Sequence, residues 1–148
     1  MIGWIFDLNK NPHARMILSA LYAEKKLRIK FPFRLFRVLI AQGVYHVELA
    51  PDSLSLEAIA TLSLPHPYNI IVHPKSTIGR NCVLFQGVTI GERKAMGGGT
   101  SPTIKDNVLI GANSVILGPI TIGTGAKIGA LSIVTHNVDC NLTIIGKH

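Results

Sequence analysis

The sequence predicts a mainly β protein, a single-stranded left-handed parallel β-helix built from six-residue repeats, with a small helical region before it. Three observations predict this fold. Aliphatic residues recur at every sixth position, glycine follows five of them, and a small or β-branched residue stands four positions further on. A helix would need apolar spacings of three and four, and sandwich strands would alternate, so a period of six favours neither.

The repeat has two inward-facing positions. The first holds Val72, Ile78, Leu84, Ile90, Ile104, Ile110, Ile116, Ile122, Ile128 and Val134. The second holds Ser76, Cys82, Val88, Val108, Ser114, Ile120, Ala126, Ser132 and Val138. We expect three repeats to make one coil of a triangular prism, with small residues packed beside the corners. Cys82 is accordingly interpreted as a packing residue and not as a nucleophile.

The repeat is interrupted once, between Ile90 and Ile104, where eight extra residues stand. The resulting loop spans residues 93–101 and is basic and rich in glycine. Long loops on rigid scaffolds often carry function. We interpret this loop either as a flexible decoration or as a flap over an active site.

The N-terminal part predicts a helical cap over residues 1–50, followed by the β-helix domain over 51–148. Apolar residues at Ile17, Leu21 and Leu27 predict a helix over 13–30. A second helix is predicted from Pro32 to about Gly43, with one face formed by Phe36, Leu39 and Ile40. Basic side chains cluster here, at Lys25, Lys26, Arg28, Lys30, Arg34 and Arg37. They indicate the solvated face of a cap, or else a surface that touches the membrane.

Charge and composition limit the partners. The formal net charge of +7 favours an anionic partner, such as a phosphorylated cofactor or an anionic membrane surface. Nothing resembles a recognition helix or an aromatic stacking surface, so nucleic acid is not expected. Two cysteines are too few for a disulfide scaffold, and neither a signal peptide nor a membrane span is indicated. We therefore expect a cytoplasmic protein, at most associated with the inner face of the membrane.

Two segments carry a family resemblance: 64–79, LPHPYNIIVHPKSTIG, and 86–91, QGVTIG. They resemble the serine acetyltransferase branch of the hexapeptide acyltransferases. Within that branch the chain is most similar to short capsule and exopolysaccharide acetyltransferases of the colanic acid type. The resemblance implies a homotrimer with active sites between neighbouring prisms, acetyl-CoA lying along the groove between them, and no metal.

The resemblance assigns His66 as the catalytic general base. A hydroxyl is a poor nucleophile until it loses its proton, and neutral imidazole suits that task near pH 7. The alternative is a core histidine, because His66 lies six residues before Val72. Flanking prolines at Pro65 and Pro67 make a strand interior improbable and favour catalysis. His73, at an expected corner, is interpreted as structural.

The sequence departs from the family at the acceptor site. Serine acetyltransferases carry Asp directly before the catalytic His, where this chain has Pro65, and an Arg-His pair where it has Thr100 and Ser101. The resemblance implies that the missing groups hold the amino acid's charged ends, so free L-serine is expected to bind poorly. Ser101 is interpreted either as an acceptor-binding residue or as a residue that closes the loop.

The resemblance also assigns cofactor contacts to Gly91, Gly111, Ala112 and Ala130, for each of which a tight corner is the structural alternative. From these observations we predict an acetyl-CoA-dependent O-acetyltransferase that acts directly on a sugar hydroxyl in surface polysaccharide synthesis. The alternatives are a serine O-acetyltransferase of cysteine biosynthesis and a non-catalytic scaffold or regulatory β-helix.

Overall fold

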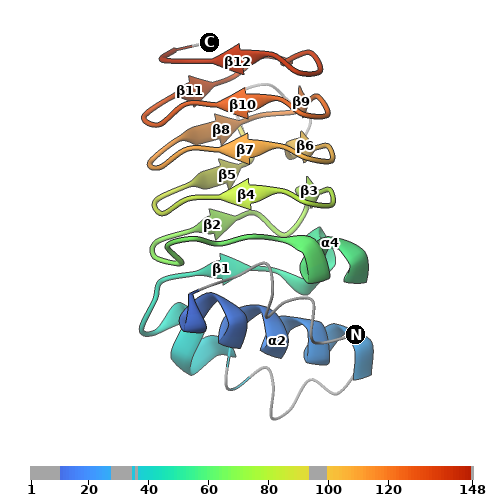
Figure 1. The fold of residues 1–148 in the computed structure, drawn as a ribbon, viewed down its shortest axis with the longest axis vertical. Coiled ribbons are helices and arrows are strands. Elements are labelled where there is room, and N and C mark those ends of the chain that lie inside the picture. Colours follow the sequence, from blue (N-terminus) through green and yellow to red (C-terminus); the bar gives the residue numbers. More distant parts are fainter. Residues whose placement is uncertain (1–10, 28–34, 36, 94–99, 148) are drawn as a thin grey trace.

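The computed structural model describes residues 11–27, 35, 37–93 and 100–147, and it confirms the predicted left-handed parallel β-helix. Triangular coils stack on one another, with the N-terminal helices at one end of the stack and the C-terminus at the other (Figure 1). Strands of two or three residues line up from coil to coil in three parallel sheets.

The three sheets form the faces of the prism. Sheet A contains β1 (Glu48–Leu49), β2 (Ile71–Val72), β5 (Thr89–Gly91), β8 (Val115–Leu117) and β11 (Ile133–Val134), in that order. Sheet B contains β3 (Thr77–Ile78), β6 (Thr103–Ile104) and β9 (Thr121–Ile122). Sheet C contains β4 (Val83–Leu84), β7 (Leu109–Ile110), β10 (Lys127–Ile128) and β12 (Thr143–Ile144). The chain runs from sheet A to B to C and back to A, and we name the corners AB, BC and CA accordingly.

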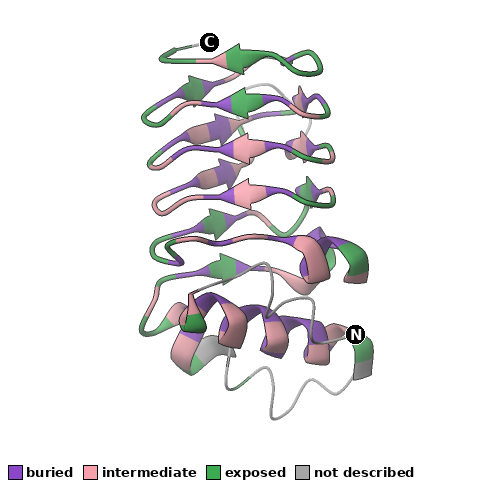
Figure 2. Cartoon of the chain, in the orientation of Figure 1, coloured by how far each residue is buried: buried purple, intermediate pink, exposed green. Residues whose placement is uncertain are grey.

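The predicted repeat positions form the core. Register pairs place Val72 beside Ile90, Ile90 beside Ile116 and Ile116 beside Val134, so aliphatic side chains stack along the prism axis. All ten first positions are at most 4% exposed, and all nine second positions are buried as well. Figure 2 shows buried residues alternating with more exposed ones along each coil. The repeat pattern therefore predicted the inside of the prism correctly.

Serines at the second inward position form hydrogen bonds with backbone groups of the coils. The Ser114 hydroxyl donates to the Gly129 carbonyl (2.7 Å), and the Ser132 hydroxyl accepts from the Gly146 N–H (3.1 Å). Both serines are fully buried, so these bonds offset the cost of removing a hydroxyl from water. The stacking is close enough that a side chain at Gly111 would lie 2.5 Å from the Ala130 nitrogen.

The N-terminal helix covers the open end of the prism. Helix α2 (Pro12–Leu27) matches the predicted helix over the described residues and fully buries Leu18 and Leu21, facing α4 (Leu56–Thr61). The side chain of Ser55 caps α4 by accepting from the Ala58 N–H at 2.9 Å. The sequence had not predicted α4, the 3₁₀ turn η2 (Pro51–Ser53) or β1.

The predicted second helix is present in part. A π-helix, η1, spans Arg37–Gln42 and ends close to the predicted boundary, while Pro32 and Phe36 lie outside the described residues. Leu39, placed on the apolar face by the prediction, is 58% exposed.

The basic cluster is described only in part. Lys25 donates to the Pro51 carbonyl (2.6 Å), and the Lys26 ammonium lies 5.7 Å from the Tyr22 ring centroid. These two cations therefore contact the protein itself, while Arg28, Lys30 and Arg34 lie outside the described residues. Within the ranges that the structure describes, no helix is both long and apolar enough to cross a membrane. Contact with a membrane surface stays a prediction.

Candidate active site

His66 lies at the CA corner, where the first coil turns towards β2. Its side chain is exposed, while Pro67 beside it is buried. The His66 ring faces Phe85 of the next coil, with ring centroids 6.4 Å apart. In an unbroken repeat the side chain at this position would point into the core. The two prolines interrupt the strand pattern, and the imidazole therefore points outward.

The segment around His66 is anchored by residues that the sequence analysis did not select. Asn11 donates to the Pro65 carbonyl (3.1 Å), and the Tyr68 N–H donates to the His66 carbonyl (2.9 Å). Aromatic rings then link Tyr68 to Tyr45 (5.5 Å between centroids) and Tyr45 to His13 of α2 (4.9 Å). Helix α2 thus braces the turn that carries the candidate base, and no local pattern in the sequence signals these contacts.

Three of the four predicted cofactor residues also lie at the CA corner, on the coils above His66. Gly111 and Ala112 follow β7, Ala130 follows β10, and the Leu131 N–H donates to the Ala112 carbonyl (2.9 Å). Ala112 is half-buried and Ala130 is exposed, so both are accessible, whereas Gly111 is buried under the next coil. Gly91 is the last residue of β5 and therefore lies at the AB corner, at the other end of the strands of sheet A.

Ser101 takes part in a cluster at the AB corner. Its hydroxyl lies 2.8 Å from Nδ1 of His73, and Nε2 of His73 lies 3.7 Å from a carboxylate oxygen of Glu92. The Lys75 N–H also points at His73 Nδ1 (3.3 Å). The side chains of His73 and Glu92 are 32% and 16% exposed, so solvent reaches both. The structure therefore gives the corner residue His73 two polar neighbours that the sequence analysis did not connect with it.

Within one chain, the structure does not bring Ser101 to His66. The two residues lie at corners CA and AB, at opposite ends of the strands of sheet A. Of the predicted loop over 93–101, the structure describes Arg93, Thr100 and Ser101, and the rest lies outside the described residues.

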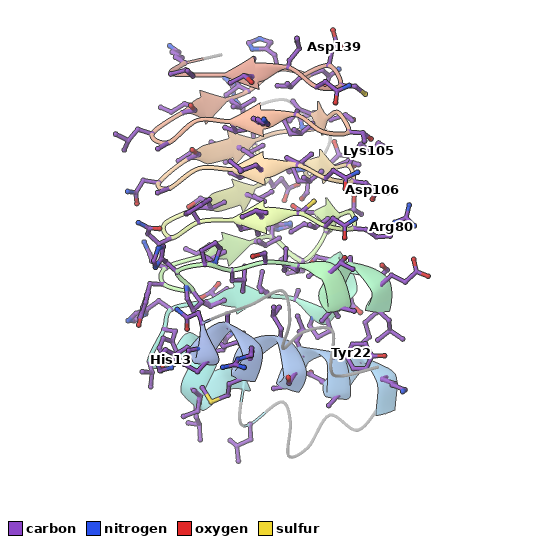
Figure 3. All side chains as sticks on the ribbon, in the orientation of Figure 1. His13, Tyr22, Arg80, Lys105, Asp106 and Asp139 are labelled. Atoms are coloured by element: carbon purple, nitrogen blue, oxygen red, sulfur yellow. The ribbon has the colours of Figure 1, made fainter. Side chains whose placement is uncertain are left out.

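The BC corner carries charge but no candidate chemistry. Arg80 donates to both carboxylate oxygens of Asp106, and this pairing lowers the pKa of Asp106 (Figure 3). Cys82 is fully buried, and burial raises the pKa of its thiol to about 11, as expected of a packing residue. A largely apolar cleft of about 540 Å³ lies nearby, lined by α2, α4 and Arg80, away from both other corners. No group of three metal-ligating side chains occurs among the described residues.

Comparisons with known proteins identify relatives across nearly the whole chain. The family model "Bacterial transferase hexapeptide (six repeats)" matches residues 101–136. The chain is 41% identical to a serine acetyltransferase of Bacillus subtilis, covering 98% of this chain and 71% of that enzyme. It is also 41% identical to a serine acetyltransferase of Bacillus licheniformis, covering 90% of this chain and 58% of that enzyme.

Solved structures also identify serine acetyltransferases as relatives of this chain. The serine acetyltransferase of Neisseria gonorrhoeae in complex with serine superposes with a TM-score of 0.76 at 27% identity, covering 98% of this chain and 63% of that chain. Soybean serine acetyltransferase complexed with serine gives a TM-score of 0.72 at 29% identity, covering 92% and 56%. The chain thus spans less than two thirds of the length of these solved enzymes.

These relatives correct the function predicted from the sequence. The predicted class, an acyltransferase that uses acetyl-CoA, is confirmed. The prediction of a sugar acceptor in polysaccharide synthesis is wrong, and similarity to colanic acid type enzymes is not supported. That prediction rested on the resemblance to colanic acid type enzymes and on three departures from the serine acetyltransferase pattern, at Pro65, Thr100 and Ser101. Similarity to serine acetyltransferases along almost the entire chain outweighs both.

Proposed function

Because the chain belongs to the serine acetyltransferase family, we propose that it transfers the acetyl group of acetyl-CoA to the side-chain hydroxyl of L-serine. The products would be O-acetyl-L-serine and free CoA, in the direction of cysteine biosynthesis and in the cytoplasm. Support comes from the two Bacillus relatives, which are serine acetyltransferases, and from the two similar solved structures of serine acetyltransferases in complex with serine.

The observation that carries the mechanism is the exposed His66 at a corner with small residues above it. In this mechanism His66 takes the proton of the serine hydroxyl while the oxygen attacks the thioester carbonyl. A C–O bond forms, the C–S bond then breaks, and the proton passes to the departing thiolate. Backbone N–H groups can stabilise the transient oxyanion, so the transfer needs no covalent enzyme intermediate.

Acetyl-CoA would lie along the CA corner. Ala112 and Ala130 present no bulk beyond a methyl group, so a pantetheine arm can approach the backbone there. The net charge of +7 complements the phosphate groups of the cofactor. Gly91 lies too far along the coil to belong to this groove in the same copy, so it would contact a cofactor that a neighbouring copy binds.

A homotrimer would bring such neighbours together. Outward side chains on sheet A include Ile71 and Ile133, which are 39% and 44% exposed, with Thr89 and Val115 on the two coils between them. Three of these four side chains are apolar, and exposed apolar side chains gathered on a rigid sheet favour a protein partner. Closed symmetry with three copies would cover these side chains and form three equivalent sites between prisms.

The test is His66→Ala, with His136→Ala as the matched control. Both histidines are exposed at corners of the prism, and His136 lies three coils away from His66. Release of CoA thiol from acetyl-CoA with L-serine should fall about 10²–10⁴-fold for His66→Ala and stay unchanged for the control. Activity of His66→Ala within a few-fold of the unmodified protein would refute the general-base role. An unmodified protein that does not acetylate L-serine would refute the proposed function and leave the non-catalytic scaffold. Light scattering tests the trimer.

A further inference from the structure

The His66 imidazole is not oriented by any side chain that bonds to it. Among the residues that the structure describes, none forms a hydrogen bond or an ion pair with this ring, and the ring of Phe85 lies against it. A general base works only when its nitrogen is aimed at the proton that it removes, and in many enzymes a third group provides that aim. The direction of this imidazole is therefore set by the ring of Phe85 and by the backbone that carries His66.

Hydrogen bonds hold the backbone on both sides of His66. Because a peptide unit is planar, the Pro65 carbonyl lies in one rigid plane with Cα of His66, and the His66 carbonyl lies in the next such plane. Asn11 Nδ2 donates to the first carbonyl (3.1 Å), and the Tyr68 N–H donates to the second (2.9 Å). With both planes held, the Cα–Cβ bond of His66 leaves the chain in a defined direction.

The first of these two bonds comes from a distant part of the chain. The Tyr68 N–H belongs to the turn itself, and the prism holds the far end of that turn, because the Gly87 N–H donates to the Tyr68 carbonyl (3.0 Å). Pro65 has no N–H, so its carbonyl is its single backbone hydrogen-bonding group, and it accepts from a side chain 54 residues away. The peptide plane before His66 therefore depends on Asn11.

Asn11 is held in place by the helix that it caps. Its Oδ1 accepts from the His13 N–H (2.9 Å), and its carbonyl accepts from the Arg15 N–H (3.2 Å). These are the two bonds expected of an N-cap residue, with Pro12 in the first helical position of α2. Because Oδ1 is engaged at the helix end, Nδ2 of the same amide points at the carbonyl of Pro65. One side chain thus joins the start of α2 to the turn that carries the base.

We propose that Asn11 is a positioning residue for His66, so that the N-terminal cap of the prism takes part in acetyl transfer by aiming the general base. This inference rests on the function proposed above. Asn11 acts through the Pro65 carbonyl and has no chemical role of its own. A misplacement of about 1 Å in an active site can lower a rate about 100-fold, so the loss of this one bond should be visible in kcat.

The variant Asn11→Asp separates the helix cap from the bond to Pro65. A carboxylate still accepts from the His13 N–H, and Asp is a good N-cap residue, but it has no hydrogen to donate to a carbonyl. We expect kcat with L-serine to fall about 10- to 100-fold, while the Tm and the KM for acetyl-CoA stay close to those of the unmodified protein. Asn11→Ser should give the same result, because its hydroxyl can cap the helix but is too short to reach Pro65.

The matched control for a lost helix cap is Ser55→Ala. Ser55 caps α4 by accepting from the Ala58 N–H (2.9 Å), and its side chain does not bond to the turn that carries His66. This control should lower the Tm and leave kcat unchanged. If Asn11→Asp and Asn11→Ser both keep kcat within twofold of the unmodified protein, the positioning role is overturned while the proposed function stands. If the unmodified protein does not acetylate L-serine, the proposed function itself fails.

A double-mutant cycle distinguishes positioning from a purely structural effect. Positioning requires the imidazole, so adding Asn11→Asp to His66→Ala should leave the residual rate of acetyl transfer within twofold of that of His66→Ala alone. A general disturbance of the site would lower the rate by the same factor with and without the imidazole. Equal factors in the two backgrounds would therefore overturn the proposal.

Discussion

Replacing Gly111 with alanine tests whether this glycine serves packing or the cofactor. A methyl group at Gly111 would lie 2.5 Å from the Ala130 nitrogen and 2.8 Å from the Gly129 carbonyl carbon. Both are backbone atoms, which cannot rotate away, so the two coils would have to separate. The same separation would stretch the 2.8 Å bond from the Gly111 N–H to the Ile128 carbonyl.

The expected cost follows from these contacts. Overpacking of this kind typically costs about 1–3 kcal/mol, and a weakened backbone hydrogen bond adds about 1 kcal/mol. The lower entropy of an unfolded chain with alanine offsets about 0.4–1 kcal/mol. We therefore expect Gly111→Ala to lower the free energy of unfolding by about 2–3 kcal/mol, which corresponds to roughly 4–12 °C in Tm for a chain of this length.

Gly91→Ala is the matched control, because the sequence assigned both glycines to the cofactor. A methyl group at Gly91 would meet only the Leu117 Cδ2 atom, at 3.2 Å, and this end of a side chain can move. Its stability should stay within about 0.5 kcal/mol of the unmodified protein. A rise in the KM for acetyl-CoA in Gly91→Ala would support its cofactor assignment.

The assay is guanidinium unfolding followed by far-UV circular dichroism, at one fixed protein concentration because the proposed trimer would make the apparent stability depend on concentration. Equal stability of Gly111→Ala and Gly91→Ala would refute the packing argument. A Gly111→Ala protein of normal stability with a raised KM for acetyl-CoA would show that Gly111 contacts the cofactor instead.

Four further predictions concern the prism itself. Ile116→Ala, at a fully buried position, should cost about 2–5 kcal/mol in a denaturant titration, whereas Thr103→Ala on the outside should change stability by about 0.5 kcal/mol or less. In the folded protein a thiol reagent should modify exposed Cys140 and not Cys82 until the chain unfolds, and rapid modification of both would contradict the burial of Cys82. Folding raises the pKa of Cys82 from 9.0 to about 11, so the contribution of the protonated thiol to stability is complete below pH 9 and is lost as the pH rises to 11. Comparing the stability of Cys82→Ala with that of the unmodified protein across this pH range measures the contribution. Asp106→Asn should slightly lower Tm at neutral pH, because it removes the charge that pairs with Arg80. The pKa of Asp106 is lowered from 3.8, so the difference in Tm from the unmodified protein should vanish as the pH falls below that value. A difference that stays constant with pH would exclude the Arg80 pairing as its cause.

The regular part of the fold could be predicted from the sequence because each repeat obeys one packing rule. Every aliphatic position from Val72 to Val134 meets the same environment one coil above and below, so a single register describes all of them. The short helix α4 obeys no such rule. Its six residues are too few to form a stable isolated helix, and its stability comes from packing against α2.

The AB cluster could have been found in part. Once Val72 and Ile90 are known to be paired, His73 must lie beside Gly91, with Glu92 one residue further on. Only the closure of the loop brings Ser101 back to this corner, and no periodic pattern predicts that. The aromatic contact between Tyr45 and Tyr68 is equally invisible in the sequence, because it joins the N-terminal region to the corner that holds His66.

The stacked coils also explain why the candidate chemistry lies where the repeat is irregular. In a regular coil the backbone groups bond to the coils above and below, and the inward side chains fill the axis, which leaves only the outward residues available for chemistry. Pro65 and Pro67 break that pattern and turn an imidazole outward. The eight extra residues after Ile90 break it again and bring Ser101 to His73. If these two irregularities form one site between copies, a variant that restores the regular repeat at either one should lose transfer to L-serine while keeping the prism intact.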